Sequence, residues 1–350
     1  MARAWILSLT AVCIALLSSC SPDQVDPTRE PGASPSHTPQ LARPLRVIDT
    51  LRLTENDTAL NVQVYPRPDP HGGILVADAE EAQVRHYSDA GDLLSAFGRR
   101  GVGPHELRSP VAAVRLSSGD LLVTDYQFKA LVYSARGDTV IRELAHPFFP
   151  VYDLDVLDDS LVLFSARLPG AYERLHVFDV YRDTVIASFF VPPVQEEMES
   201  AARTVGITAA AVHHDTIAAV FALSDSIYFF LSSGQRTGAV ATGSHNFRPL
   251  ATPPPVGPDS RGRMPNWVAS FSMMSDIAWL SDGRFVLQYQ DRQNMLPRWR
   301  LLGMGADLTT VFELMDTPRL LTVHGDGERL LFEEPTGLSP NKWLVVEWER

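Results

Sequence analysis

The stretch FGRRGVGPHELRSP, residues 97–110, combines three glycines with three arginines and is a candidate for anion binding. Glycine-rich loops cradle phosphates where their backbone N–H groups open a helix. Neither G-x-x-x-x-G-K-[ST] nor G-x-G-x-x-G occurs here, and the stretch precedes an expected strand that begins near Pro110. The pattern therefore favours a tight connector, in which glycine supplies positive φ.

Other residues with catalytic potential do not complete a motif. His105-Glu106 begins like H-E-x-x-H but continues Leu-Arg-Ser, so this zinc pattern fails. No G-x-S-x-G nucleophile elbow occurs. The run from His213 to Asp215 resembles a ligand cluster, but adjacent strand residues point to opposite sides, so we expect no metal there. Asp78 and Asp125 each end an apolar run and are expected to bond nearby turn backbone.

The chain beyond residue 45 consists of short apolar runs that turn residues interrupt every eight to twelve positions, which is typical of all-β folds. The clearest repeat pairs GGILVADAEEAQVRHYSDAGDLLSAFG (72–98) with SGDLLVTDYQFKALVYSARGDTVIREL (118–144). Six copies start at 72, 119, 159, 215, 283 and 328. A period in the forties with several strands per copy indicates a six-bladed β-propeller over residues 45–350. A β-sandwich is the alternative.

The two ends of this domain together supply one blade. The last copy offers three candidate strands, at 319–325, 329–334 and 342–349, whereas the other copies offer four. One strand, RVIDTLRL at 46–53, is left over at the N-terminal end. We expect it to complete the sixth blade, because that pairing closes the ring and leaves no open sheet edge at the seam.

The stretch G-x-G-P-x-E-L-x-x-P, followed by SGDLLVTD and a strand with a tyrosine, resembles NHL-type six-bladed propellers. More narrowly, it is similar to propeller lipoproteins of bacteria with large secretomes. The resemblance is strong over residues 72–144 and fainter elsewhere. It implies the propeller fold and, for most members, a role as a binding platform, although a few relatives are enzymes.

The N-terminus predicts a lipoprotein of the bacterial envelope. Residues 1–19 hold Arg3 and then an apolar segment too short for a membrane span, which is typical of a signal peptide. Leu17-Ser18-Ser19-Cys20 resembles a lipobox, which implies cleavage before Cys20 and acylation of its thiol. An ordinary secretory signal is the alternative. Residues 20–44 contain six prolines and few apolar residues, so we expect a disordered tether. The serine after Cys20 resembles outer-membrane sorting.

Composition excludes several classes of protein. The net charge of −12 argues against nucleic-acid binding, which needs a basic surface. The two cysteines are Cys13, which leaves with the signal, and Cys20, which takes lipid, so no disulfide or zinc–thiolate site is expected. No cofactor motif is found, and no cofactor is expected.

The strand order of a propeller brings its long loops to one face. With four antiparallel strands per blade, the crossovers to the next blade all emerge at the same end of the ring. The crossovers at 98–110, 191–206 and 242–267 therefore share a face, and loops on a rigid scaffold often bind partners. Their cations and one aromatic anchor predict an anionic partner; the candidate binding residues are Arg99, Arg100, His105, Arg108, Arg261, Arg263 and Trp267.

Two functions remain open on the sequence. The first is a non-catalytic interaction module, tethered by lipid, that presents the crossover face to a protein, peptide or glycan. The second is a metal-dependent enzyme of the lactonase or lyase kind, with a site in the central channel of the propeller. That site needs oxygen or imidazole ligands that converge from different blades. The sequence favours the binding module, because no motif marks such ligands.

Overall fold

The structure is a computed structural model of the chain, and it describes residues 44–54, 64–126, 129–137, 139–144, 148, 150–194, 206–251, 266–293, 296–324, 327–334 and 342–349. The predicted signal peptide (1–19), Cys20 and all of the predicted tether except Pro44 lie outside the described residues. Within these ranges, no helix is long and apolar enough to cross a membrane.

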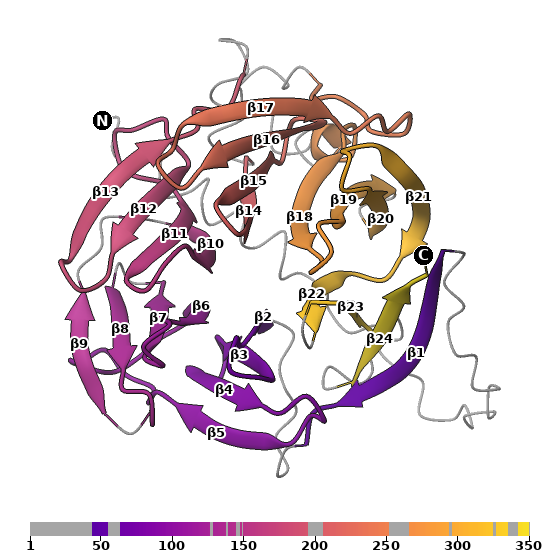
Figure 1. Cartoon of the computed structure of the whole chain (residues 1–350). Coiled ribbons are helices and arrows are strands. Elements are labelled where there is room, and N and C mark those ends of the chain that lie inside the picture. The colour runs from indigo at the N-terminus through magenta and orange to yellow at the C-terminus, as the bar shows by residue number, and fades with distance from the viewer. Residues whose placement is uncertain are drawn as a thin grey trace.

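The described residues form six four-stranded antiparallel sheets around a ring (Figure 1). Blades one and two consist of β2 (Val64–Pro68), β3 (Ile74–Asp78), β4 (Gln83–Tyr87), β5 (Leu93–Phe97) and of β6 (Pro110–Arg115), β7 (Leu121–Asp125), β8 (Lys129–Tyr133), β9 (Val140–Leu144). Blades three and four consist of β10 (Val151–Val156), β11 (Leu161–Ala166), β12 (Leu175–Asp179), β13 (Thr184–Phe189) and of β14 (Thr208–His213), β15 (Thr216–Phe221), β16 (Ser226–Leu231), β17 (Arg236–Ala241). Blades five and six consist of β18 (Met273–Trp279), β19 (Phe285–Gln293), β20 (Leu296–Met304), β21 (Thr310–Thr317) and of β22 (Leu320–His324), β23 (Arg329–Glu333), β24 (Lys342–Trp348), β1 (Leu45–Arg52).

Both faces of the blades are buried, because consecutive blades pack face to face around the ring. In β7, Leu121 and Val123 join the core shared with blade one, and Leu122 joins the core shared with blade three. A separate apolar cluster of this kind joins each pair of neighbouring blades, blades six and one included. This two-sided burial explains why the second strands are apolar at nearly every position instead of alternating with polar residues.

Ring closure follows the sequence prediction. β1 pairs antiparallel with β24, from Leu45 opposite Trp348 to Arg52 opposite Lys342. Figure 1 shows the indigo β1 beside the yellow β24, so the two ends of the domain share one sheet. Leu51 of β1 and Trp343 of β24 are both buried in the core that blade six shares with blade one. The predicted six-bladed propeller is confirmed, and the β-sandwich is not observed.

We expect deletion of residues 45–54 to unfold or aggregate the protein. The deletion removes β1, exposes the backbone groups of β24 and uncovers Trp343, which is 1% exposed. Deletion of 21–40 leaves every described strand intact and should shift Tm by less than about 2 °C. Thermal unfolding followed by circular dichroism, together with size-exclusion chromatography, measures both effects. Equal losses from the two deletions would contradict closure by β1.

Candidate functional site

The glycine-rich crossover from β5 to β6 binds a carboxylate of its own. Gly103 N donates to Glu106 Oε2 over 2.9 Å, and Arg99 lies 2.8 Å from the other carboxylate oxygen. A Cβ at Gly101 would lie 1.8 Å from Glu106 Oε2, so glycine permits this approach. Leu107 is buried in the core between blades one and two. The expected connector is confirmed, but of its three glycines Gly98 alone has positive φ. Gly101 and Gly103 instead leave room for the Glu106 carboxylate.

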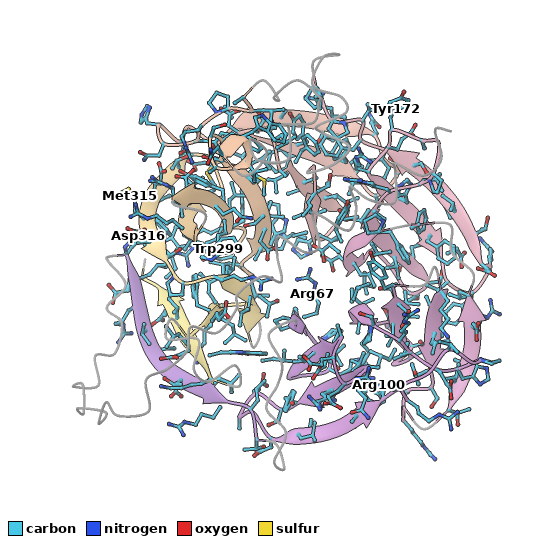
Figure 2. The ribbon with its side chains drawn as sticks, turned by 180° about the vertical axis from the view of Figure 1, so that it is seen from behind. Arg67, Arg100, Tyr172, Trp299, Met315 and Asp316 are labelled. Atoms are coloured by element: carbon cyan, nitrogen blue, oxygen red, sulfur yellow. The ribbon has the colours of Figure 1, made fainter. Side chains whose placement is uncertain are left out.

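The described part of this crossover carries four of the predicted binding residues. Each of them is exposed: Arg99, Arg100, His105 and Arg108. Arg99 is already paired with Glu106. Figure 2 shows Arg100 away from the central opening of the ring. Arg261 and Arg263 lie outside the described residues, so the role of these cations in binding stays a prediction.

Trp267 is not exposed, contrary to its predicted role as an anchor for a partner. Trp267 is only 7% exposed, and the centroid of its ring lies 5.1 Å from that of the Phe271 ring. Its Nε1 donates to Ala251 O over 2.8 Å. The indole is a large apolar group in this crossover, and burying it holds the crossover together. It is therefore not available as an exposed aromatic contact.

His213 ends β14, and His214 follows it in the predicted turn before β15. His213 stacks on Trp279 of blade five, with 5.1 Å between ring centroids and 21° between planes. This contact joins blades four and five at the end of the ring opposite the crossovers. Among the described residues, no group of three His, Cys, Asp or Glu side chains could hold a metal ion.

A cavity of about 940 Å³ lies in the central channel. The innermost strands of all six blades line it: β2, β6, β10, β14, β18 and β22. It also includes Asp69 and Gly72 from the β2–β3 turn and Glu328 from the β22–β23 turn. No residue of the described crossovers contributes to its wall. The cavity therefore occupies the end of the channel opposite the crossover face.

Arg67 projects into this channel from blade one and pairs with Asp153 of blade three. Figure 2 shows Arg67 in the central opening of the ring. Asp153 is 6% exposed, and its Oδ1 also accepts from Leu154 N over 2.8 Å. Because blade two lies between the two partners, the ion pair crosses part of the channel instead of joining neighbouring strands.

Two further carboxylates, those of Asp155 and Asp276, attract the Arg67 guanidinium electrostatically. Asp155 of β10 accepts from Val156 N and from Val212 N of blade four, over 2.8 and 2.7 Å. Asp276 of β18 accepts from Ile277 N over 2.9 Å. We call Arg67, Asp153, Asp155 and Asp276 the channel floor. Its three carboxylates exceed its one cation, so the fully ionised floor is negative.

The pKa values of the channel floor reflect this imbalance. Burial raises the pKa of Asp155 to about 6, and the hydrogen bond from Val212 N and the attraction to Arg67 only partly offset this shift. Burial also raises the pKa of Asp276 to about 6, and attraction to Arg67 and Arg319 only partly offsets it. Burial alone would lower the pKa of Arg67, but attraction to Asp153, Asp276 and Asp155 outweighs it and raises that pKa. Arg67 therefore stays charged, while Asp155 and Asp276 gain protons in mildly acidic solution.

β-Bulges bring Asp153 and Asp276 to equivalent places in blades three and five. The β10–β11 register shifts between Val151 and Asp153, and the β18–β19 register shifts between Met274 and Asp276. Val151 and Leu154 consequently share one core although they are three positions apart, which strict alternation forbids. Strict alternation does not predict the channel floor for this reason; aspartates within mostly apolar first strands, as in VYDLDV and MMSDIAW, are the signal that could have found it.

Comparisons with known proteins identify the fold. No family model matches the sequence, and no curated protein matches it. The structure is similar to that of a DUF4221 family member from Bacteroides vulgatus, with a TM-score of 0.62 and 12% identity over 87% of this chain and 97% of that chain. It is also similar to a Bacteroides fragilis protein named for its expected export, with a TM-score of 0.58 and 13% identity over 87% and 96% of the two chains. At these identities the likeness shows the fold alone.

We expect Asp276→Asn to stabilise the protein at pH 7.5. The raised pKa means that the native state holds this proton more tightly than the unfolded chain, so the free energy of unfolding falls as pH rises from about 4 to about 6. Removing the charge should raise the free energy of unfolding by about 1–3 kcal/mol at pH 7.5 and change it little near pH 4. Denaturant unfolding at both pH values measures this difference.

Glu80→Gln is the matched control, because it also removes one negative charge but from an exposed turn residue. It should leave stability nearly unchanged at both pH values. A loss of stability in Asp276→Asn at pH 7.5 would contradict the raised pKa.

Proposed function

We propose that this chain is a lipid-anchored protein of the bacterial envelope whose propeller binds a small ligand in its central channel. The observation that supports this function best is the cavity of about 940 Å³ with charged groups at its floor. Ligand pockets in proteins have volumes of this order, and a few placed polar groups give them specificity. A rigid ring of six blades suits such a site, because it holds the lining strands in place.

The envelope location rests on the sequence and on one structural relative. The predicted lipobox ending at Cys20 supplies the anchor, and the serine after Cys20 supports the outer membrane. The Bacteroides fragilis relative, named for its expected export, agrees with an envelope location. Pro44 O accepts from Glu349 N beside the rim strand β1. A tether that enters there would attach the propeller by its rim and leave both ends of the channel free.

The crossover face is a second surface that we propose for a larger partner. Arg99, Arg100 and Arg108 expose cations on an otherwise acidic chain, which suits an anionic protein, peptide or glycan. Exposed ion pairs contribute little each. With Trp267 buried, the aromatic side chains exposed in the described part of this end are Tyr126 and Tyr172, in the β7–β8 and β11–β12 turns, which are 39% and 48% exposed. The channel cavity is the stronger candidate for the primary site, because the inner strands of all six blades line it.

A metal-dependent reaction in the channel is less well supported. Carboxylates do converge from blades three and five, as such a site requires, but Arg67 places a fixed cation among them. A divalent ion at the same point would be repelled by the guanidinium. The acidic residues of the channel floor are better explained as partners of Arg67 and of a ligand.

We expect Cys20→Ser to block processing, because the lipoprotein signal is cleaved only after the cysteine thiol is acylated. The variant should accumulate as a longer precursor when it is expressed in the native host. Gel mobility and partition into detergent phase measure cleavage and lipidation. Normal cleavage with release into the soluble fraction would refute the lipid anchor.

We expect Val212→Phe to abolish capture of a small ligand, because Val212 lines the cavity and a larger side chain reduces its volume. The purified domain is incubated with a small-molecule extract of the native organism, and adducts are detected by native mass spectrometry. Ile141→Phe is the control, since Ile141 is 50% exposed on the outer strand β9. Adducts that survive Val212→Phe but disappear in a variant with Arg99→Ser and Arg100→Ser would place the site on the crossover face instead.

A further inference from the structure

The charge of the cavity wall restricts the ligands that it can accept. Six carboxylates and three arginines line the cavity. Two of the arginines are each matched by one carboxylate: Arg67 pairs with Asp153, and Arg115 Nε lies 2.6 Å from Asp69 Oδ2. The remaining lining charges are one arginine and four carboxylates: Arg329, Asp89, Asp155, Asp276 and Glu328. An anionic ligand would therefore enter a site that already has excess negative charge.

The channel floor has more acceptors than donors. Asp276 Oδ1 accepts from Ile277 N, and within the described part of the chain no group donates to Asp276 Oδ2. Each Asp155 oxygen accepts one backbone N–H, and each has a further lone pair. Arg67 directs its Nη2 to Asp153. A bound group that brings several N–H donors and a positive charge would fill these vacant acceptor positions.

The walls above the channel floor favour an organic cation over a bare metal ion. Val156, Val212 and Val323, which are half-buried, give the cavity an apolar part, together with the half-buried Trp279. An alkyl stem can pack there while its charged end reaches the carboxylates. A metal ion requires several ligands around it, and the described residues hold no such group. A single positive charge is also repelled less by Arg67 than a double charge.

We propose that the channel cavity binds a small organic cation, in which a primary ammonium or guanidinium group docks on Asp276 and Asp155 beside Arg67. This inference rests on the proposed function and names the chemical class of its ligand. It assigns to Asp276 and Asp155 the role of holding the cationic end, and to the apolar wall the role of holding its stem.

Three probes of one scaffold test the charge preference. N-acetyl-L-lysinamide carries an ammonium group at pH 7.5, N-acetyl-L-norleucinamide is neutral and of nearly the same shape, and N-acetyl-L-glutamic acid α-amide is an anion. Isothermal titration calorimetry on the folded domain measures each Kd. We expect the lysine probe to bind at least about tenfold more tightly than the norleucine probe, and the glutamate probe to bind most weakly.

Variants assign the binding to the channel floor. Asp276→Asn preserves the shape of the side chain. It should raise the Kd of the lysine probe about tenfold or more and leave the Kd of the norleucine probe unchanged. Glu80→Gln removes an equal charge from an exposed turn and should change neither. Thermal unfolding of each variant confirms that it is folded.

The outcomes separate this inference from the proposed function. Tighter binding of the norleucine or glutamate probe, abolished by Val212→Phe, would support a channel site but overturn the cationic class. Lysine-probe binding that Asp276→Asn leaves intact would overturn the assigned carboxylates. If none of the probes binds while an extract ligand is captured in the channel, the cationic class is wrong and the proposed function stands.

Discussion

The pairing of β1 with β24 is the contact on which the channel depends. Blade packing alone would leave a three-stranded last sheet, with Trp343 uncovered and an open edge at the seam. Closure joins the two ends of the domain and fixes the positions of all six inner strands. Arg67 and Asp276, which are far apart along the chain, can then act on each other across one channel. The geometry of any ligand site on the inner strands therefore depends on the pairing of β1 with β24.

The sequence predicts the ring well and its interior poorly. Apolar second strands such as that from Leu121 to Asp125 recur with a turn before each, so strand type, blade number and closure could be derived from local pattern. The channel floor could not, because a bulge before Asp153 and another before Asp276 break the alternation that assigns side chains to faces. The prediction that Trp267 is an exposed anchor was wrong for a different reason. Its burial depends on contacts with Ala251 and Phe271, which the spacing of residues in the sequence does not reveal.

The two ends of the propeller have different chemistry. The crossover end exposes arginines on a loop that Glu106 and Leu107 hold in place. The opposite end opens into a cavity whose floor has excess carboxylate. Half-buried carboxylates with raised pKa values cost stability, and proteins commonly retain such groups where function requires them. The channel floor thus departs from what folding alone would favour.

Asp155 and Asp276 lack full charge compensation at the channel floor. The most direct measurement is a pH titration of their carboxyl carbons by ¹³C NMR, with each signal assigned from the corresponding Asp→Asn variant. We expect both groups to titrate with an apparent pKa of about 6, well above that of an ordinary aspartate. Titration of both near 3.8, the usual value, would contradict it by showing that the described floor is fully compensated.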